Sequence, residues 1–229
     1  MLNFIQISLT NKCNYSCWHC PMGKWRNSIP PKYPLNNKEL IDFFIRYLDP
    51  NVWIVELTGG EPSLYEGLND LLKWLSVNSY YTLVKTNGSN PIDRFENVKI
   101  VAAFHRLQEP PKCYDEILIV DKIDALEKKV YCENNKIPYH IIGYNTENPD
   151  GAVHGFTNCA YINNAGHETT CKAMPPVERV SMDGIDYGRI DRNPFFSGKC
   201  CARCKAAVDA WRFLPEEIKS KGVLKFKDS

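Results

Sequence analysis

The chain has 229 residues, 44% of them hydrophobic and 24% charged, with a formal net charge of +1 at pH 7. These values are typical of a globular protein with a substantial core, and so small a charge excludes general electrostatic attraction to nucleic acid or anionic membranes. No apolar run approaches the roughly 20 residues that cross a bilayer, and the first residues carry no export signal. We therefore expect a cytoplasmic protein without a membrane partner or strong nucleic-acid binding.

Strands and helices alternate along residues 1–145. Apolar and β-branched runs predict strands at Leu2–Leu9, Val52–Thr58, Tyr80–Thr86, Val98–Phe104, Asp115–Val120 and Pro138–Tyr144. Apolar residues at helical spacing predict helices at Lys38–Leu48, Leu68–Asn78 and Lys122–Asn135, the first with Asn36 or Asn37 as its N-cap. The connection between the fourth and fifth strands is too short and proline-rich for a helix. This alternation predicts parallel βαβ units whose functional loops follow the carboxyl ends of the strands.

The pattern changes after Tyr144. Residues 145–171 are rich in Asn, Gly and Thr and are predicted to be loop-like. A hairpin is expected to turn at Asp183–Gly184, and a final helix is expected to break at Pro215. We expect two units, a first domain at 1–145 and a small extension at 146–229.

Ten cysteines are many for a chain expected in a reducing compartment, where clustered thiols more often hold metal than form disulfides. Cys113 and Cys132 stand alone, and we expect them to be buried apolar side chains. The others form a front group and a rear group. The front group is Cys13, Cys17 and Cys20, within "CNYSCWHC", and the rear group is Cys159, Cys171, Cys200, Cys201 and Cys204.

The spacing of the front group allows its thiolates to converge on one soft metal centre. A cubane iron–sulfur cluster usually takes four cysteine ligands, one per iron, so three leave one iron open to an outside ligand. Zinc with three thiolates is an alternative, although structural zinc sites favour CxxC pairs and a closed fourth position. A disulfide would leave one thiol unpaired.

A second motif, "LTGGEP", follows the second predicted strand at Leu57–Pro62. Its two glycines would let a ligand lie against the backbone, their N–H groups could donate to a carboxylate, and Glu61 could accept from an ammonium. An amino-acid moiety would suit such a loop. The alternative is a Gly-Gly turn with a solvated glutamate.

These two motifs, together with "KTNGS" after the third strand, resemble those of the radical S-adenosylmethionine (radical SAM) superfamily. The resemblance implies an α/β fold, a partial (βα)6 TIM-like barrel, with a [4Fe-4S] cluster on Cys13, Cys17 and Cys20. Reductive cleavage of S-adenosylmethionine at this cluster would give a 5′-deoxyadenosyl radical that abstracts hydrogen from a peptide or small-molecule substrate. A reductase, flavodoxin or ferredoxin would supply the electron.

The same resemblance assigns further residues to the cofactor. Those expected near S-adenosylmethionine are Gly59, Gly60, Glu61, Thr86, Asn87 and His19, the last at the aromatic position of the cysteine motif. Many members carry a serine at the end of the fourth strand, where this chain has Ala103. That departure makes His105 a candidate for contact with cofactor or substrate, the alternative being a packed histidine.

The rear cysteines resemble the SPASM and twitch extensions, which bind auxiliary [4Fe-4S] clusters. Cysteines expected after the hairpin glycine and after "CARC" are missing, which excludes a two-cluster extension. One auxiliary cluster is expected, with zinc or free thiols as alternatives. Its ligands would be Cys171, Cys201 and Cys204 with Cys159 or Cys200.

Other functions remain open at this stage. The substrate could be a nucleoside, nucleotide or sugar, and nothing before the first strand suggests a domain that captures a leader peptide. A non-catalytic iron–sulfur electron carrier or zinc-stapled interaction module is the alternative of a different class. Carriers of the ferredoxin type close every iron with protein ligands, whereas the front motif supplies three.

Overall fold

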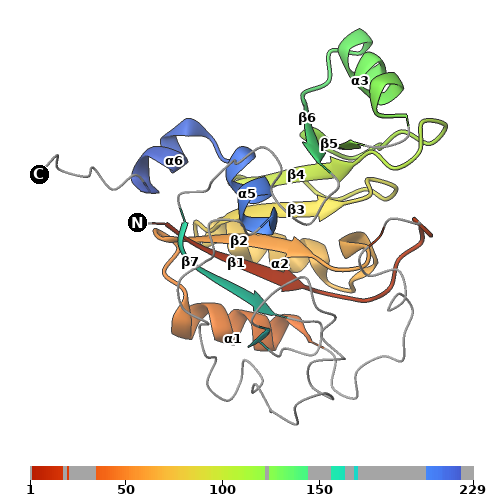
Figure 1. Ribbon diagram of the computed structural model, residues 1–229. Helices are drawn as coiled ribbons and strands as arrows, with labels where there is room; N and C mark the ends of the chain where they lie inside the picture. The colour runs from red at the N-terminus through yellow and green to blue at the C-terminus, as the bar shows by residue number, and fades with distance from the viewer. Residues whose placement is uncertain are drawn as a thin grey trace, which may run out of the picture.

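The computed structural model describes residues 2–17, 20, 35–121, 124–143, 156–162, 168–169 and 205–222. They form an eight-stranded sheet in the order β6-β5-β4-β3-β2-β1-β7-β8 (Figure 1). Its first six strands are β1 (Leu2–Ser8), β2 (Trp53–Thr58), β3 (Tyr81–Thr86), β4 (Val98–Ala103), β5 (Glu116–Asp121) and β6 (Tyr139–Gly143). These strands run parallel, each beside the next in sequence. This arrangement confirms the predicted α/β fold, a partial TIM-like barrel.

Two helices cover one face of the sheet. Helix α1 (Asn37–Tyr47) and helix α2 (Leu68–Val77) place Phe44 and Leu72 in a core with Ile5 of β1 and Val55 of β2. Asn36 is the N-cap of α1, since its side chain accepts a hydrogen bond from the Glu39 N–H at 3.0 Å. The β-branched strand residues and the amphipathic helices therefore bury their apolar sides against each other.

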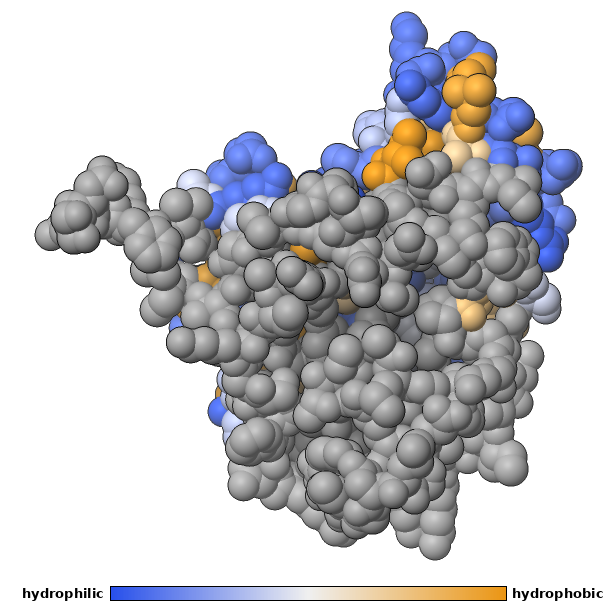
Figure 2. Space-filling view, viewed as in Figure 1, coloured by the Kyte–Doolittle hydropathy of each residue, from blue (hydrophilic) through white to orange (hydrophobic). Residues whose placement is uncertain are grey.

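The far edge of the sheet carries helix α3 (Ala125–Asn134), which packs Cys132 against Ile117 and Ile119 of β5. No helix lies between β4 and β5, where residues 104–115 are all described, so that prediction is confirmed. In Figure 2 the surface over α3 is mostly hydrophilic, with hydrophobic residues emerging on it. Among the described helices, none is long and apolar enough to span a membrane.

The opposite face of the sheet is covered by helix α5 (Lys205–Arg212), which is followed by α6 (Glu216–Gly222). Three small residues let α5 approach the strands closely, and they pack with Phe213 against the inward side chains of β1 to β5. The small residues are Ala206, Ala207 and Ala210. The two helices are separated at Pro215, which confirms the predicted break.

The region after Tyr144 contains a strand that the sequence did not predict. Strand β7 (Phe156–Ile162) runs parallel to β1, and β8 (Glu168–Thr169) pairs antiparallel with β7. The prediction of a loop there is wrong, because the free edge of β1 offers a backbone partner that overrides the Asn- and Gly-rich local composition. The sheet thus continues past the expected boundary between 1–145 and 146–229, and the division into two domains stays a proposal. The predicted hairpin at Asp183–Gly184 lies outside the described residues.

Candidate functional site

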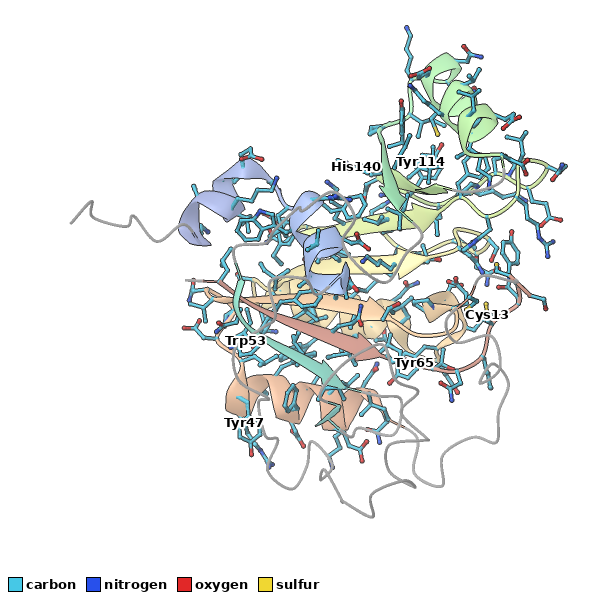
Figure 3. The ribbon with its side chains drawn as sticks, viewed as in Figure 1. Cys13, Tyr47, Trp53, Tyr65, Tyr114 and His140 are labelled. Carbon is cyan, nitrogen blue, oxygen red and sulfur yellow. The ribbon has the colours of Figure 1, made fainter. Side chains whose placement is uncertain are left out.

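A cavity of about 160 Å³ opens at the carboxyl ends of the parallel strands. Cys13, labelled in Figure 3, lies beyond the end of β1 at this side of the sheet. The loop after β1, the carboxyl-end halves of β2, β3 and β4, and Leu118 within β5 all contribute to the cavity wall. The lining residues are Cys13, Tyr15, Cys17, Cys20, Thr58, Gly60, Lys85, Thr86, Asn87, Val101, Ala103, His105 and Leu118.

The three front cysteines share this cavity, and each is partly exposed. Within the described residues, no group of three or more His, Cys, Asp or Glu side chains could hold a single metal ion. A zinc ion needs all of its thiolates within about 2.3 Å of one point, whereas a four-iron cluster binds each thiolate at a different iron. Three thiols that line one cavity could each hold a different iron of a [4Fe-4S] cluster.

Side chains inside the cysteine motif fasten its loop to the neighbouring loops. The Asn87 amide donates to Asn14 Oδ1, and the Asn14 amide donates to Ser89 Oγ, both at 2.8 Å. The Arg106 guanidinium carbon lies 4.7 Å from the centre of the Tyr15 ring, and the His105 ring lies 6.0 Å from it. Burial, followed by the nearby Glu109, raises the pKa of Tyr15 above its ordinary value. These contacts hold the thiols against the ends of β3 and β4.

Sequence reasoning missed the roles of Asn14, Tyr15 and Ser89. Asn14 is bonded to Asn87 and Ser89, which lie 73 and 75 residues further along the chain. The short cysteine motif does not indicate those contacts. The position of Tyr15 within a cysteine motif at a strand end was the one available signal. It pointed to the site but not to the neighbouring strand.

The two glycines of "LTGGEP" pack backbone against backbone with the start of the cysteine loop. A Cβ atom on Gly60 would lie 2.2 Å from the Lys12 carbonyl oxygen, and one on Gly59, where φ is +141°, would lie 2.5 Å from that of Thr10. The Gly60 N–H donates to Thr10 O at 2.6 Å, and the Glu61 N–H donates to Lys12 O at 2.7 Å. The expectation that the glycine N–H groups donate to a ligand carboxylate is therefore wrong for Gly60, because the neighbouring loop uses that donor.

Glu61 lies behind the cavity wall and is only 1% exposed. One carboxylate oxygen accepts from the Thr86 hydroxyl at 2.6 Å and the Ser63 N–H at 3.0 Å. The other accepts from the Asn87 N–H at 2.7 Å. The alternative of a solvated glutamate in a simple turn is thus wrong, since Glu61 joins the loops after β2 and β3. Its contact with an ammonium group stays a prediction.

The other expected residues divide into those that the structure brings to the cavity and those that it does not describe. Thr86, Asn87, Ala103 and His105 all line the cavity, and the expected contacts of Thr86, Asn87 and His105 with cofactor or substrate stay predictions. Cys113 and Cys132 are buried away from it, at 8% and 0% exposure, as expected. The residues outside the described part of the chain are His19, Cys171, Cys200, Cys201 and Cys204. Cys159 lies in β7, where its backbone pairs with that of Phe4 in β1. The auxiliary cluster or zinc site stays a prediction.

Comparison with known proteins agrees with this geometry. The family model of the radical SAM superfamily matches residues 7–148, well over half of the chain. The chain belongs to the radical SAM superfamily. The family uses a [4Fe-4S] cluster with S-adenosylmethionine. The described thiols and loops suit both groups.

Two sequence relatives share only part of the chain. The 7-carboxy-7-deazaguanine synthase of Clostridium acetobutylicum is 38% identical over 93 residues, which cover 40% of this chain and 41% of that protein. GTP 3′,8-cyclase of Aquifex aeolicus is 37% identical over 76 residues, covering 33% and 24%. The chain thus spans less than half the length of these curated relatives.

A solved structure shares the fold. The crystal structure of SuiB from Streptococcus suis bound to S-adenosylmethionine aligns with a TM-score of 0.52 at 12% identity. The alignment covers 82% of this chain and 67% of SuiB. This likeness supports the partial TIM-like barrel.

Proposed function

We propose that Cys13, Cys17 and Cys20 hold a [4Fe-4S] cluster, that the adjoining loops bind S-adenosylmethionine, and that the enzyme removes a hydrogen atom from a small-molecule substrate. The observation that carries this proposal is one cavity shared by three thiols, Gly60 and the ends of β3 and β4. Together, the bound cluster and S-adenosylmethionine supply a 5′-deoxyadenosyl radical. The electron would come from a reductase, flavodoxin or ferredoxin.

The chain's own residues would bind and orient the cluster and S-adenosylmethionine and exclude water from them. Glu61 fixes Thr86 and the Asn87 N–H, and Asn87 in turn fixes the cysteine loop through Asn14. Gly59 and Gly60 allow the two loops to approach each other. The expected contacts of Gly59, Gly60, Glu61, Thr86 and Asn87 with S-adenosylmethionine are part of this proposal. Ala103 offers the cavity no polar group, so His105 is the polar side chain that β4 and its following loop contribute.

Several observations favour a small substrate. Val101 and Leu118 line the cavity and also pack in the core beneath α5, so α5 closes the barrel below the cavity. A closed floor suits a small molecule or one compact group of it. Both sequence relatives are named for reactions of purine-type compounds, which supports a heterocyclic substrate.

The first test is reductive cleavage of S-adenosylmethionine. Anaerobically reconstituted protein, reduced with dithionite, should convert S-adenosylmethionine to 5′-deoxyadenosine. Replacing Cys13, Cys17 or Cys20 by alanine should abolish this product and lower the iron content, because each thiolate holds one iron.

Cys132→Ala is the matched control, since Cys132 is fully buried against β5 and lies outside the cavity. It should keep both iron and 5′-deoxyadenosine production. Wild-type production by any of the three front variants would refute the cluster assignment. An intact cluster in the wild type without any 5′-deoxyadenosine would favour the electron-carrier alternative.

A further inference from the structure

The floor of the cavity carries a charged residue that the proposed chemistry does not use. Lys85 on β3 pairs in register with Val101 on β4, and both line the cavity. Val101 also packs in the core beneath α5. Lys85 therefore lies in the layer where the cavity meets the closed interior of the barrel.

Lys85 belongs to a polar layer that crosses three adjacent strands. Its Nζ lies 2.9 Å from Glu56 Oε2 on β2, and the Glu56 side chain is fully buried while that of Lys85 is 14% exposed. On the other side, the Gln6 amide of β1 donates to Glu56 Oε1. The three side chains occupy the same face because each follows, by two positions, an inward residue of the α5 core. Those inward residues are Phe4, Ile54 and Leu83.

This layer is polar but carries no net charge. Burying a carboxylate is costly unless a cation compensates it, and Lys85 supplies that cation for Glu56. Among the described lining residues, Lys85 is the side chain with a full positive charge at neutral pH. An anion that reached the floor would therefore meet an ammonium already neutralised, with a carboxylate directly behind it. Repulsion from that carboxylate is poorly screened in such an environment.

We propose that the Gln6–Glu56–Lys85 layer makes the cavity floor select an uncharged, hydrogen-bonding part of the substrate and reject phosphate and carboxylate groups. A heterocycle, a sugar or an amide fits such a floor. This inference rests on the proposed function, because it assumes that the cavity also receives the substrate. It narrows the substrate class, since a phosphate-bearing compound would have to keep its phosphates away from this layer.

The test uses inorganic pyrophosphate as the probe, titrated calorimetrically into reconstituted protein with S-adenosylmethionine present. Glu56→Gln keeps the shape and a partner for Gln6 but leaves the Lys85 charge unbalanced. It should bind pyrophosphate at least about tenfold more tightly than the wild type. The double variant Glu56→Gln, Lys85→Met should return to the wild-type level.

Glu116→Gln is the control, because it removes the carboxylate of a second lysine pair, with Lys99, on the same sheet face outside the lining residues. It should not gain pyrophosphate affinity. If thermal melting shows that Glu56→Gln does not fold, Gln6→Lys is tested in its place. This variant adds one positive charge to the same layer, so it should also bind pyrophosphate more tightly than the wild type.

Two results would overturn the proposal. One is a folded Glu56→Gln protein, or in its place Gln6→Lys, that binds pyrophosphate no better than the wild type. The other is a wild type that already binds it as tightly as the variant. Formation of 5′-deoxyadenosine is measured separately without pyrophosphate, so failure of the proposed function is distinguished from failure of the charge-balanced floor.

Discussion

Glu61 shows how one buried carboxylate can organise a cofactor loop. It accepts three hydrogen bonds, from Ser63, Thr86 and Asn87, and it is almost inaccessible to solvent. The Thr86 hydroxyl in turn accepts from the Gly88 N–H at 3.0 Å. A change at Glu61 therefore acts on the loops after β2 and β3 together. Its effect on S-adenosylmethionine combines any direct contact with this organisation.

We expect Glu61→Ala to keep the iron content but to weaken S-adenosylmethionine binding. Hydrogen bonds to a charged group contribute roughly 1.5–3 kcal/mol, so the dissociation constant should rise about ten- to a hundredfold. Equilibrium binding of S-adenosylmethionine to the reconstituted protein, together with iron analysis, measures both quantities.

Thr86→Val separates the two contributions of Glu61. This variant removes the Thr86–Glu61 hydrogen bond while keeping the side-chain shape and the carboxylate. Because Thr86 itself lines the cavity, the decisive outcome is a loss of affinity much smaller than that of Glu61→Ala, which would favour direct contact of Glu61 with the ammonium. Unchanged affinity in Glu61→Ala would contradict a cofactor role for this loop.

At the residue scale, the sequence predicted the kinds of side chain at the site better than their contacts. The cysteine spacing and "LTGGEP" indicated the cavity because both motifs follow parallel strands, whose carboxyl ends meet at one edge. The use of the Gly60 N–H by Thr10 and the Gln6–Glu56–Lys85 layer were missed. Both depend on which strands are neighbours, which a single motif does not contain.

At the scale of elements, the loops after β1 and β2 behave as one unit. Hydrogen bonds from Gly60 and Glu61 to Thr10 and Lys12 extend the β1–β2 pairing beyond the strand ends. The cysteine loop begins directly after this seam, so its path depends on the close packing that Gly60 allows.

Gly60→Ala should disturb this seam and, through it, the cluster. Its Cβ would lie 2.2 Å from Lys12 O and 2.7 Å from Asn11 O, so the backbones would have to separate. Overpacking of this kind costs about 1–3 kcal/mol. We expect a lower melting temperature together with reduced iron content after reconstitution.

Gly67→Ala is the matched control. Gly67 has a positive φ of +83°, and a Cβ there would meet the side chain of Asn37; neither residue lines the cavity that holds the thiols. It should lower the melting temperature without loss of iron. Normal iron content in Gly60→Ala would show that the seam does not position the cysteines.

Most elements were predictable because their apolar periodicity agrees with their tertiary role. Helix α1 and strand β2 were predicted to within one residue at each end. Strand β7 was not, because "FTNCAYI" owes its extended form to the backbone edge of β1 rather than to a strong local pattern. The role of α5 was equally hidden: its sequence predicts a helix but not that it fills the concave face of the sheet.

At the scale of the whole molecule, a second polar group ties α5 to the far half of the sheet. Glu116 of β5 pairs with Lys99 of β4, and its other oxygen lies 3.0 Å from His140 Nε2 of β6. The Lys99 ammonium also donates to the Phe213 carbonyl at 3.0 Å, just after α5, and the His140 ring packs edge-on against Phe213 at 4.9 Å. Three strands thus meet at one carboxylate, and both of its partners also contact Phe213. Figure 3 shows His140 on β6, at the edge of the sheet.

The pH dependence of stability should report this junction. Burial by itself would raise the pKa of Glu116, but hydrogen bonds from His140 and Lys99 and their charges outweigh it, so the pKa lies below its usual value. The carboxylate form therefore stabilises the fold fully above the unfolded pKa, about 4.3, and this contribution is lost as the pH falls through the lowered value. Glu116→Gln should melt below the wild type at pH 5.5, by about 2–4 °C for each kcal/mol lost.

The difference between the two proteins should shrink as the pH falls from 5.5 to 3, because protonation removes the same charge from the wild type. Glu216→Gln is the control: Glu216 pairs with Lys219 on α6, but its side chain is 87% exposed, so solvent screens the pair. That variant should follow the wild type at every pH. A Glu116→Gln difference that stays constant down to pH 3 would show that its carboxylate charge does not hold α5 to the sheet. The loss of stability would then come from packing alone.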